Sequence, residues 1–259
     1  MNVPTMADMM AQGKQPEVLF WVGAAGSYDD RAKKISRAFV KILVHSNVNF
    51  AVLGTEESST GDAAKRAGNE FLFQMQAMTN IEVLNGYEVK KIVTCDPHSF
   101  NTLKNEYSSL GGKYEVFHHT QFIQNLISEG RLKIDDTVLK GKRVTFHDPC
   151  YLGRANDVYE SPRDLIKRLG VNLTEMKRNK SSALCCGAGG AQMFKDAEKG
   201  DKEINVLRTE DALETNPEII ATGCPYCNTM MTDGIKFKEK EAEVVVKDIA
   251  ELIAEANNL

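Results

Sequence analysis

The spacing of the cysteines constrains this chain more than any other feature of its sequence. Five of its six cysteines lie between residues 150 and 227, as Cys150, the pair Cys185 and Cys186, and a CxxC motif made by Cys224 and Cys227. The N-terminus has no basic segment followed by an apolar one, so we expect no secretory signal. In a reducing, cytoplasmic environment, clustered cysteines indicate metal ligands or redox thiols rather than disulfides.

Four kinds of chemistry remain open for these cysteines. They could pack as small hydrophobic side chains, or the CxxC motif alone could carry out thiol redox chemistry. A structural zinc ion would need only four ligands. An iron–sulfur cluster accepts a shell made of cysteine sulfur alone. Five cysteines in CC and CxxC spacing favour a metal site over packed thiols.

Composition excludes two classes of function. The chain has 259 residues, of which 26% are charged, and a formal net charge of −4. No basic excess indicates nucleic-acid binding. The longest apolar runs, such as residues 18–22, are far shorter than the roughly 18 residues of a membrane span. We therefore expect a globular protein that reaches a membrane, if at all, through a partner.

Hydrophobic periodicity predicts strands and helices in alternation. We expect strands at 17–22, 48–53, 90–94, 114–118, 143–146, 171–176, 219–222 and 243–246. Helices are expected at 30–45, 63–78, 99–107, 121–127, 163–169, 203–213, after Cys224, and at 248–255. The polar segment 129–141 has no clear period and is interpreted as a linker. This alternation is typical of an α/β fold with mainly parallel sheets.

An internal repeat divides the chain into two halves. Residues 92–99 align with residues 220–227, so that Pro97 matches Pro225. Ala24 and Ser59 are separated by 34 residues, as are Cys150 and Cys185. We therefore predict two similar α/β halves around a pseudo-twofold axis, with domains at residues 16–140 and 141–259.

The predicted strand ends place the cysteines where an α/β sheet binds ligands. Cys150 follows one strand, and Cys224 lies between another strand and the helix that Pro225 begins. Free backbone N–H groups at such a helix start favour a thiolate. For Cys185 and Cys186 to converge the backbone must turn sharply, and the glycines at 187, 189 and 190 allow that.

These motifs resemble the tandem cysteine-rich, or CCG, domain family. The resemblance rests on the HDPCYLGR stretch at 147–154, the CCGAGG stretch at 185–190, the CPYC motif at 224–227 and residues 100–107. The family includes the B and D components of heterodisulfide reductase. It also includes the iron–sulfur subunits of glycolate oxidase, anaerobic glycerol-3-phosphate dehydrogenase and the L-lactate utilisation system.

The resemblance implies a [4Fe–4S] cluster in the second half. In heterodisulfide reductase the clusters are noncubane and use all five cysteines of each motif. Carried over by position, the ligands here would be Cys150, Cys185, Cys186, Cys224 and Cys227. The chain would then be an iron–sulfur electron-transfer subunit of an oxidoreductase complex rather than an autonomous enzyme. Its partner would be a flavoprotein dehydrogenase or a ferredoxin-type protein. The alternative is a non-redox scaffold with a structural zinc ion.

The first half departs from the family pattern. Ala24, Ser59, Asp96 and Ser99 stand where a two-cluster relative would have cysteines, and these groups suit iron–sulfur clusters poorly. We therefore expect one cluster per chain. Cys95 is one position out of register, and either packs in the core or reaches the cluster of the other half.

Five other side chains are candidates for supporting roles. His147 and Asp148 precede Cys150 and could form hydrogen bonds to cluster sulfurs. His98 aligns with Tyr226 and could line a pocket. His118 and His119 resemble a metal pair, but neighbours on a strand would point to opposite faces, which favours a structural or surface role.

Overall fold

Two four-stranded parallel sheets of identical strand order form the framework of the protein. The computed structural model describes residues 3–196 and 199–259. The first sheet has the order β2-β1-β3-β4 and contains β1 (Val18–Trp21), β2 (Phe50–Ala51), β3 (Lys91–Thr94) and β4 (Glu115–His118). The second has the order β6-β5-β7-β8 and contains β5 (Arg143–Phe146), β6 (Asn172–Leu173), β7 (Ile219–Thr222) and β8 (Val245–Asp248). The prediction of two similar α/β halves with parallel sheets is confirmed.

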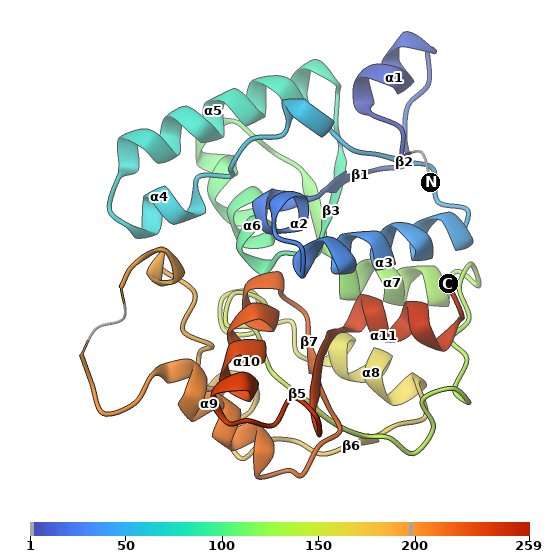
Figure 1. Cartoon of the computed structure of the whole chain (residues 1–259). Helices are drawn as coiled ribbons and strands as arrows, with labels where there is room; N and C mark the ends of the chain where they lie inside the picture. The colour runs from blue at the N-terminus through green and yellow to red at the C-terminus, as the bar shows by residue number, and fades with distance from the viewer. Residues whose placement is uncertain (1–2, 197–198) are drawn as a thin grey trace.

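Helices follow the strands in both halves (Figure 1). The first half contains α1 (Met6–Ala11), α2 (Gly23–Tyr28), α3 (Ala32–His45), α4 (Asp62–Arg66), α5 (Glu70–Gly86), α6 (Pro97–Asn101) and α7 (His119–Ser128). The second contains α8 (Glu160–Arg168), α9 (Ile204–Leu213), α10 (Pro225–Phe237) and α11 (Ile249–Ala256). The described segment 129–141 forms neither helix nor strand, as expected of a linker.

One predicted helix is two helices in the structure. The segment 63–78 breaks after α4, because Gly68 adopts a φ of +87° and ends the first helix. Asn69 then starts α5, where its side chain accepts a hydrogen bond from Leu72 N. The apolar residues keep a helical spacing on both sides of the break, so hydrophobic periodicity alone could not locate it.

Three further elements are shorter than predicted. The strands expected at 48–53 and 171–176 extend only over Phe50–Ala51 and Asn172–Leu173, each at an edge of its sheet. The helix expected at 99–107 is α6 followed by a π-turn over Thr102–Glu106 and a 3₁₀ turn over Tyr107–Leu110. The short helices α1 and α2 were not predicted.

Four helices pack between the two sheets and join the halves. Helix α3 of the first half packs against α11 of the second, and α7 packs against α8, in the middle of the molecule (Figure 1). A single hydrophobic cluster contains buried residues of both halves, among them Phe20, Phe39, Phe146 and Ile253. The two sheets lie on either side of residue 140 in sequence, but their helices share one core.

Candidate metal centre

Cys224 and Cys227 are held by the junction between β7 and α10. Cys224 is the N-cap of α10, and its sulfur accepts a hydrogen bond from the backbone N–H of Cys227 at 3.5 Å. Pro225 occupies the first turn, where its missing N–H costs nothing. The prediction that Cys224 lies between a strand and a helix is confirmed.

The conformation of Gly187 brings Cys185 and Cys186 close to Cys224 and Cys227. Gly187 has a φ of +93°, which an L-residue would adopt only with strain, and its N–H donates to the sulfur of Cys185 at 3.3 Å. Cys150 lies in the turn after β5. The loop geometry predicted for CCGAGG is therefore present.

The structure brings the five thiols together in one place. The sulfurs of Cys186 and Cys227 are 3.3 Å apart, and the side chains of Cys150 and Cys185 contact each other. Cys186, Cys224 and Cys227 are buried, whereas Cys150 and Cys185 are half-buried. All five side chains therefore lie at the carboxyl ends of β5 and β7, where sequence reasoning expected them.

Crowding of the sulfurs shifts their ionisation in opposite directions. Hydrogen bonding to Cys185 raises the pKa of Cys150 and of Cys186, and burial adds to the effect. Hydrogen bonds from these two thiols and from Gly187 N lower the pKa of Cys185. The group therefore favours one thiolate among several thiols. A bound cation is what would let the others ionise, since thiolates are the metal-binding form.

The buried ring of His147 lies beside these sulfurs. A ring nitrogen of His147 lies within 4.8 Å of the sulfurs of Cys186 and Cys227, and the side chain is fully buried. Arg208 Nε donates to His147 Nδ1 at 3.0 Å, so Nδ1 is an acceptor and the proton is on Nε2. Nε2 has no hydrogen-bond partner among the described residues.

This tautomer distinguishes a hydrogen-bond donor from a metal ligand. A ligating histidine normally donates its second N–H to an acceptor, whereas here that position accepts from a cation. Burial lowers the pKa of His147 to about 3, and Arg208 acts in the same direction, so the ring is neutral. A neutral, buried ring beside two thiols, with an N–H that has no partner among the described residues, fits a sulfur-rich cluster, whose sulfurs accept hydrogen bonds, better than a lone zinc ion.

Asp148 does not take the role expected for it. Both of its carboxylate oxygens are bound by Arg163, at 2.7 and 2.8 Å, and one also accepts from Lys180 N. Because Asp148 follows His147 in the sequence, the two were expected to share a role at the sulfurs. A buried carboxylate requires a cation partner, however, and here that partner is Arg163. Asp148 instead fixes α8 to the turn that follows β5.

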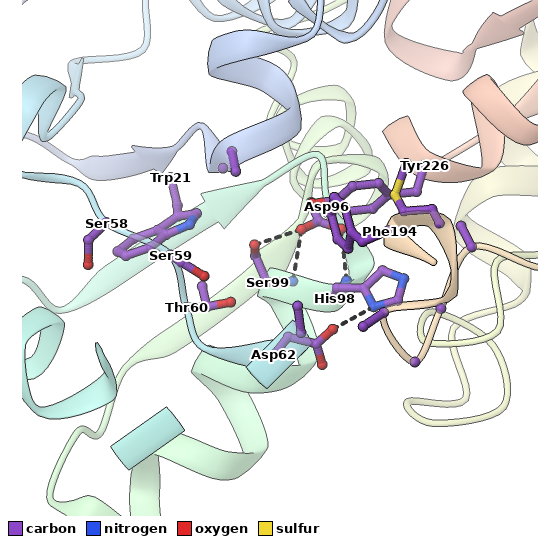
Figure 2. A pocket seen from close by; sticks show the side chains of 18 residues that line it. Trp21, Ser58, Ser59, Thr60, Asp62, Asp96, His98, Ser99, Phe194 and Tyr226 are labelled. Atoms are coloured by element: carbon purple, nitrogen blue, oxygen red, sulfur yellow. Dashed lines mark hydrogen bonds and ion pairs between the residues drawn. The ribbon is translucent and has the colours of Figure 1, made fainter. Parts of the chain in front are cut away.

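The positions equivalent to the ligands in the first half form a different kind of site. Of the residues that the structure describes, the group with three or more His, Cys, Asp or Glu ligand atoms within 4.8 Å of one another is the His147, Cys186 and Cys227 group of the second half. Asp96 caps α6 and accepts hydrogen bonds from His98 N and from Ser99 (Figure 2). The first half thus uses its Asp96 as a helix cap where the second uses Cys224.

Cys95 lies in the core shared by the halves rather than with the other cysteines. It is buried in the hydrophobic cluster that contains Phe20 and Ile253, whereas Cys186, Cys224 and Cys227 form a separate cluster. Burial raises the pKa of Cys95 well above its usual value, so it stays a thiol.

His118 and His119 are buried and face each other. Their ring centroids are 4.3 Å apart, because the strand ends at His118 and α7 begins at His119. The expectation that they point to opposite faces of a strand is therefore wrong. His118 Nε2 is 2.9 Å from Gly223 O, next to Cys224, and His119 Nε2 is 3.0 Å from Asp248 Oδ1. Their role is structural, as preferred, but internal rather than at the surface.

Sequence reasoning missed two side chains of these sites. Arg208, which sets the tautomer of His147, is one basic residue of a helix, and nothing in the sequence distinguishes it from its surface counterparts. Trp21 lies at the position equivalent to His147, three residues before Ala24. The alignment of the two repeats already matched Trp21 with His147, so this residue could have been found from the sequence.

Comparison with known proteins establishes the class. The cysteine-rich domain (CCG) family model matches residues 18–104 and again residues 144–232. The chain belongs to this family and carries two copies of its domain.

Three relatives illustrate what the chain is similar to. It is 48% identical over 256 residues to the "Probable iron-sulfur-binding oxidoreductase FadF" of Bacillus subtilis, and covers 36% of that protein. It is 43% identical over 262 residues to the "EtfAB:quinone oxidoreductase" of Syntrophomonas wolfei, again covering 36%. It is 33% identical over 254 residues to one component of the dihydromethanophenazine:CoB–CoM heterodisulfide reductase of Methanosarcina barkeri, covering 59%. These alignments cover 98, 98 and 94% of this chain, which therefore spans between one third and three fifths of these relatives.

Proposed function

We propose that this chain holds one iron–sulfur cluster in its second half and transfers electrons within an oxidoreductase complex. The observation that carries the proposal is the convergence of five cysteine side chains beside the buried ring of His147. Two copies of the cysteine-rich domain and relatives named as iron–sulfur oxidoreductases support it. The zinc scaffold is not favoured by these relatives.

The proposed ligands are Cys150, Cys185, Cys186, Cys224 and Cys227, which would hold a [4Fe–4S] cluster. Five sulfurs exceed the four that a cubane uses, which favours the noncubane form of the family. Such a cluster would exchange one electron at a time with a partner. The chain's residues hold the thiolates, exclude water, and direct the His147 N–H at the sulfurs.

We propose a redox protein as that partner, either a flavoprotein dehydrogenase or a ferredoxin-type protein. Relatives named for EtfAB and for heterodisulfide reductase support a place in a larger complex. Among the described residues no helix has both the length and the apolar character needed to cross a bilayer. The domain boundaries 16–140 and 141–259 and a cytoplasmic location are part of the same proposal.

Iron and acid-labile sulfide analysis of protein purified without oxygen tests the cluster. We expect about four iron and about four sulfide per chain. Cys224→Ala should abolish both, and Cys95→Ala, which removes the core thiol, should leave both unchanged.

Each other result contradicts a stated part of the proposal. Zinc without sulfide would establish the scaffold alternative. Twice the expected iron would show that the first half also binds a cluster.

A further inference from the structure

His118 of the first half holds the carbonyl that precedes a proposed cluster ligand. Its Nε2 lies 2.9 Å from Gly223 O, and Gly223 is bonded to Cys224. A carbonyl oxygen only accepts, so Nε2 carries the proton, and Nδ1 accepts the hydroxyl proton of Thr120 across 2.7 Å. Burial lowers the pKa of His118 well below its usual value, which keeps the ring neutral. The ring is therefore fixed in one orientation and one tautomer.

The close approach of this ring depends on a glycine. A Cβ at Gly223 would lie 3.3 Å from His118 Cε1, which is tighter than an ordinary contact. The donor in the first half and the missing side chain in the second therefore match across the boundary between the halves.

The equivalent position in the second half cannot make the same contact. Asp248 ends β8 as His118 ends β4, and Cys95 occupies the repeat position of Gly223. The carboxylate of Asp248 accepts from Ala250 N, and a carboxylate does not donate to a carbonyl. The donor therefore stands on the side where the cysteines gather, which a purely structural contact between repeats would not require.

His98 of the first half contacts all three segments that carry the cysteines. Its ring centroid lies 4.4 Å from that of Tyr151, in the turn that holds Cys150, and 5.4 Å from that of Tyr226, inside the CPYC motif. A Cβ at Gly189, in the CCGAGG segment, would lie 3.4 Å from His98 Cε1. One side chain of the first half thus packs against every ligand-bearing segment of the second.

His98 is held from within the first half. Its Nδ1 lies 2.9 Å from Asp62 Oδ2, and Arg66 binds the other oxygen of Asp62 (Figure 2). The ring lines a pocket of about 110 Å³, as the sequence suggested, whose walls include Trp21 of the first half and Tyr226 of the second. The first half therefore presents a ring in a fixed position to the segments of the second.

A third contact reaches the turn after β5. Asn156 Nδ2 donates to Tyr151 O at 2.7 Å and to Asn101 Oδ1 at 3.1 Å, and its Oδ1 accepts from Asn105 at 2.9 Å. Asn101 and Asn105 belong to the stretch of the first half that keeps the family pattern. That stretch therefore has a contact to the second half, although the ligand positions beside it are no longer cysteines.

We propose that the first half positions the cluster of the second half, with His118 as the positioning residue for Cys224. The hydrogen bond to Gly223 O fixes the peptide between Gly223 and Cys224, so that the Cys224 sulfur is held in place before iron binds. The inference rests on the proposed function, because it assigns the residues that hold the ligands of that cluster.

Release of iron to the chelator bathophenanthroline disulfonate, from protein purified without oxygen, tests this role. His118→Phe keeps a ring and removes the donor, and its iron should leave about tenfold faster than that of the wild type. His118→Gln places an amide N–H near the position of Nε2 and should restore most of the difference. Phe39→Ala, which weakens the core that the halves share, should release iron at the wild-type rate.

Amide hydrogen exchange in the metal-free protein supplies a measurement that needs no cluster. In His118→Phe the amides of residues 223–228 should exchange about tenfold faster, since one hydrogen bond of ordinary strength corresponds to about that factor. Asn101→Ala tests the separate contact to the turn after β5 and should also accelerate iron release. It keeps the inference testable if His118→Phe does not fold.

Three results would overturn the inference. They are iron release and exchange in His118→Phe that match the wild type, a His118→Gln protein that behaves like His118→Phe, and equally fast iron release from Phe39→Ala. If His118→Phe does not fold, wild-type iron release from Asn101→Ala overturns it. A wild type without iron would instead overturn the proposed function, and exchange at 223–228 would still decide whether His118 holds this segment.

Discussion

Individual residues at the two equivalent sites differ in chemistry while sharing a position. His147 and Trp21 occupy equivalent positions at the end of a central strand. Both are fully buried, and each has a ring nitrogen with no partner among the described residues. Cys224 and Asp96 are both N-caps of the following helix. The two halves therefore carry different chemistry at equivalent positions, a thiol in the second half and a carboxylate in the first.

The N–H of His147 should raise the reduction potential of the cluster. A donated hydrogen bond stabilises the more negative, reduced form, and one such bond of about 1 kcal/mol corresponds to roughly 40 mV for one electron. His147→Leu should therefore lower the potential by tens of millivolts at unchanged iron content. Redox titration followed by EPR measures this, with His45→Leu as the control. An unchanged potential in fully loaded His147→Leu protein would show that the N–H does not act on the cluster.

Glu57 should make stability depend on pH. Its carboxylate accepts from the N–H groups of Val22 and Gly23, but burial outweighs them and raises its pKa to about 7. Between pH 4.5 and 7 the folded state therefore holds a proton that the unfolded state has lost. Stability is full below this window and falls as the pH rises through it, by up to about 3 kcal/mol.

Comparison of the wild type with Glu57→Gln isolates this contribution. The glutamine cannot ionise, so its unfolding free energy should decline less between about pH 5 and about pH 8. Urea denaturation at both pH values measures the difference. Parallel pH profiles for the two proteins would mean that Glu57 titrates normally.

At the scale of elements, the second half depends on close packing between α9 and α10. A Cβ at Gly234 would collide with the side chain of Thr209 and approach Asn205 O. Gly234 is therefore required by the neighbouring helix and not by its own backbone conformation, which is helical.

Gly234→Ala should destabilise the protein by about 1–3 kcal/mol despite the better helix propensity of alanine. Thr209→Ala in the same chain should recover most of this loss, since it removes the hydroxyl oxygen, which is the atom nearest to the added Cβ. Gly86→Ala in α5, where a Cβ meets nothing within 4 Å, serves as control and should be neutral or stabilising. Thermal unfolding compares the wild type, Gly234→Ala, Thr209→Ala, the double variant and Gly86→Ala, and additive effects of the Gly234 and Thr209 changes would rule out the collision.

At the scale of the whole molecule, the shared core should make the halves unfold together. Phe39 on α3 is fully buried against Phe20 and His119, with ring centroids at 5.1 and 5.8 Å, and α3 packs on α11 of the other half. Arg31 adds a bidentate ion pair to Glu251 across the same interface. The linker therefore connects two halves that share one hydrophobic core.

Phe39→Ala should lower the unfolding free energy by about 3–5 kcal/mol. Native-state hydrogen exchange should then accelerate equally in β3 of the first half and β7 of the second. Val44→Ala, on the exposed face of the same helix, should change neither. Acceleration confined to β3 would show that the halves are separate folding units.

The sequence by itself determined the repeat, the α/β class, the place of Cys150 and Cys224 after strands, and the turn that holds Cys185 and Cys186. These follow from local patterns, because strand–helix alternation, Pro225 at a helix start and the glycines after Cys186 act within a few residues. The break at Gly68 depends on a positive φ, and the two-residue pairing at 172–173 depends on contacts with the neighbouring strand; periodicity encodes neither.

Only the tertiary structure decided which distant residues complete the hydrogen bonds and walls of the two sites. Arg208 reaches His147 from 61 residues away and fixes its proton, and Asp62 reaches His98 from 36 residues away. The pocket beside Trp21 is lined by residues of both halves, Tyr226 among them. Hydrogen bonds and cavity walls between distant segments depend on how the halves pack, and a linear pattern carries no information on that packing.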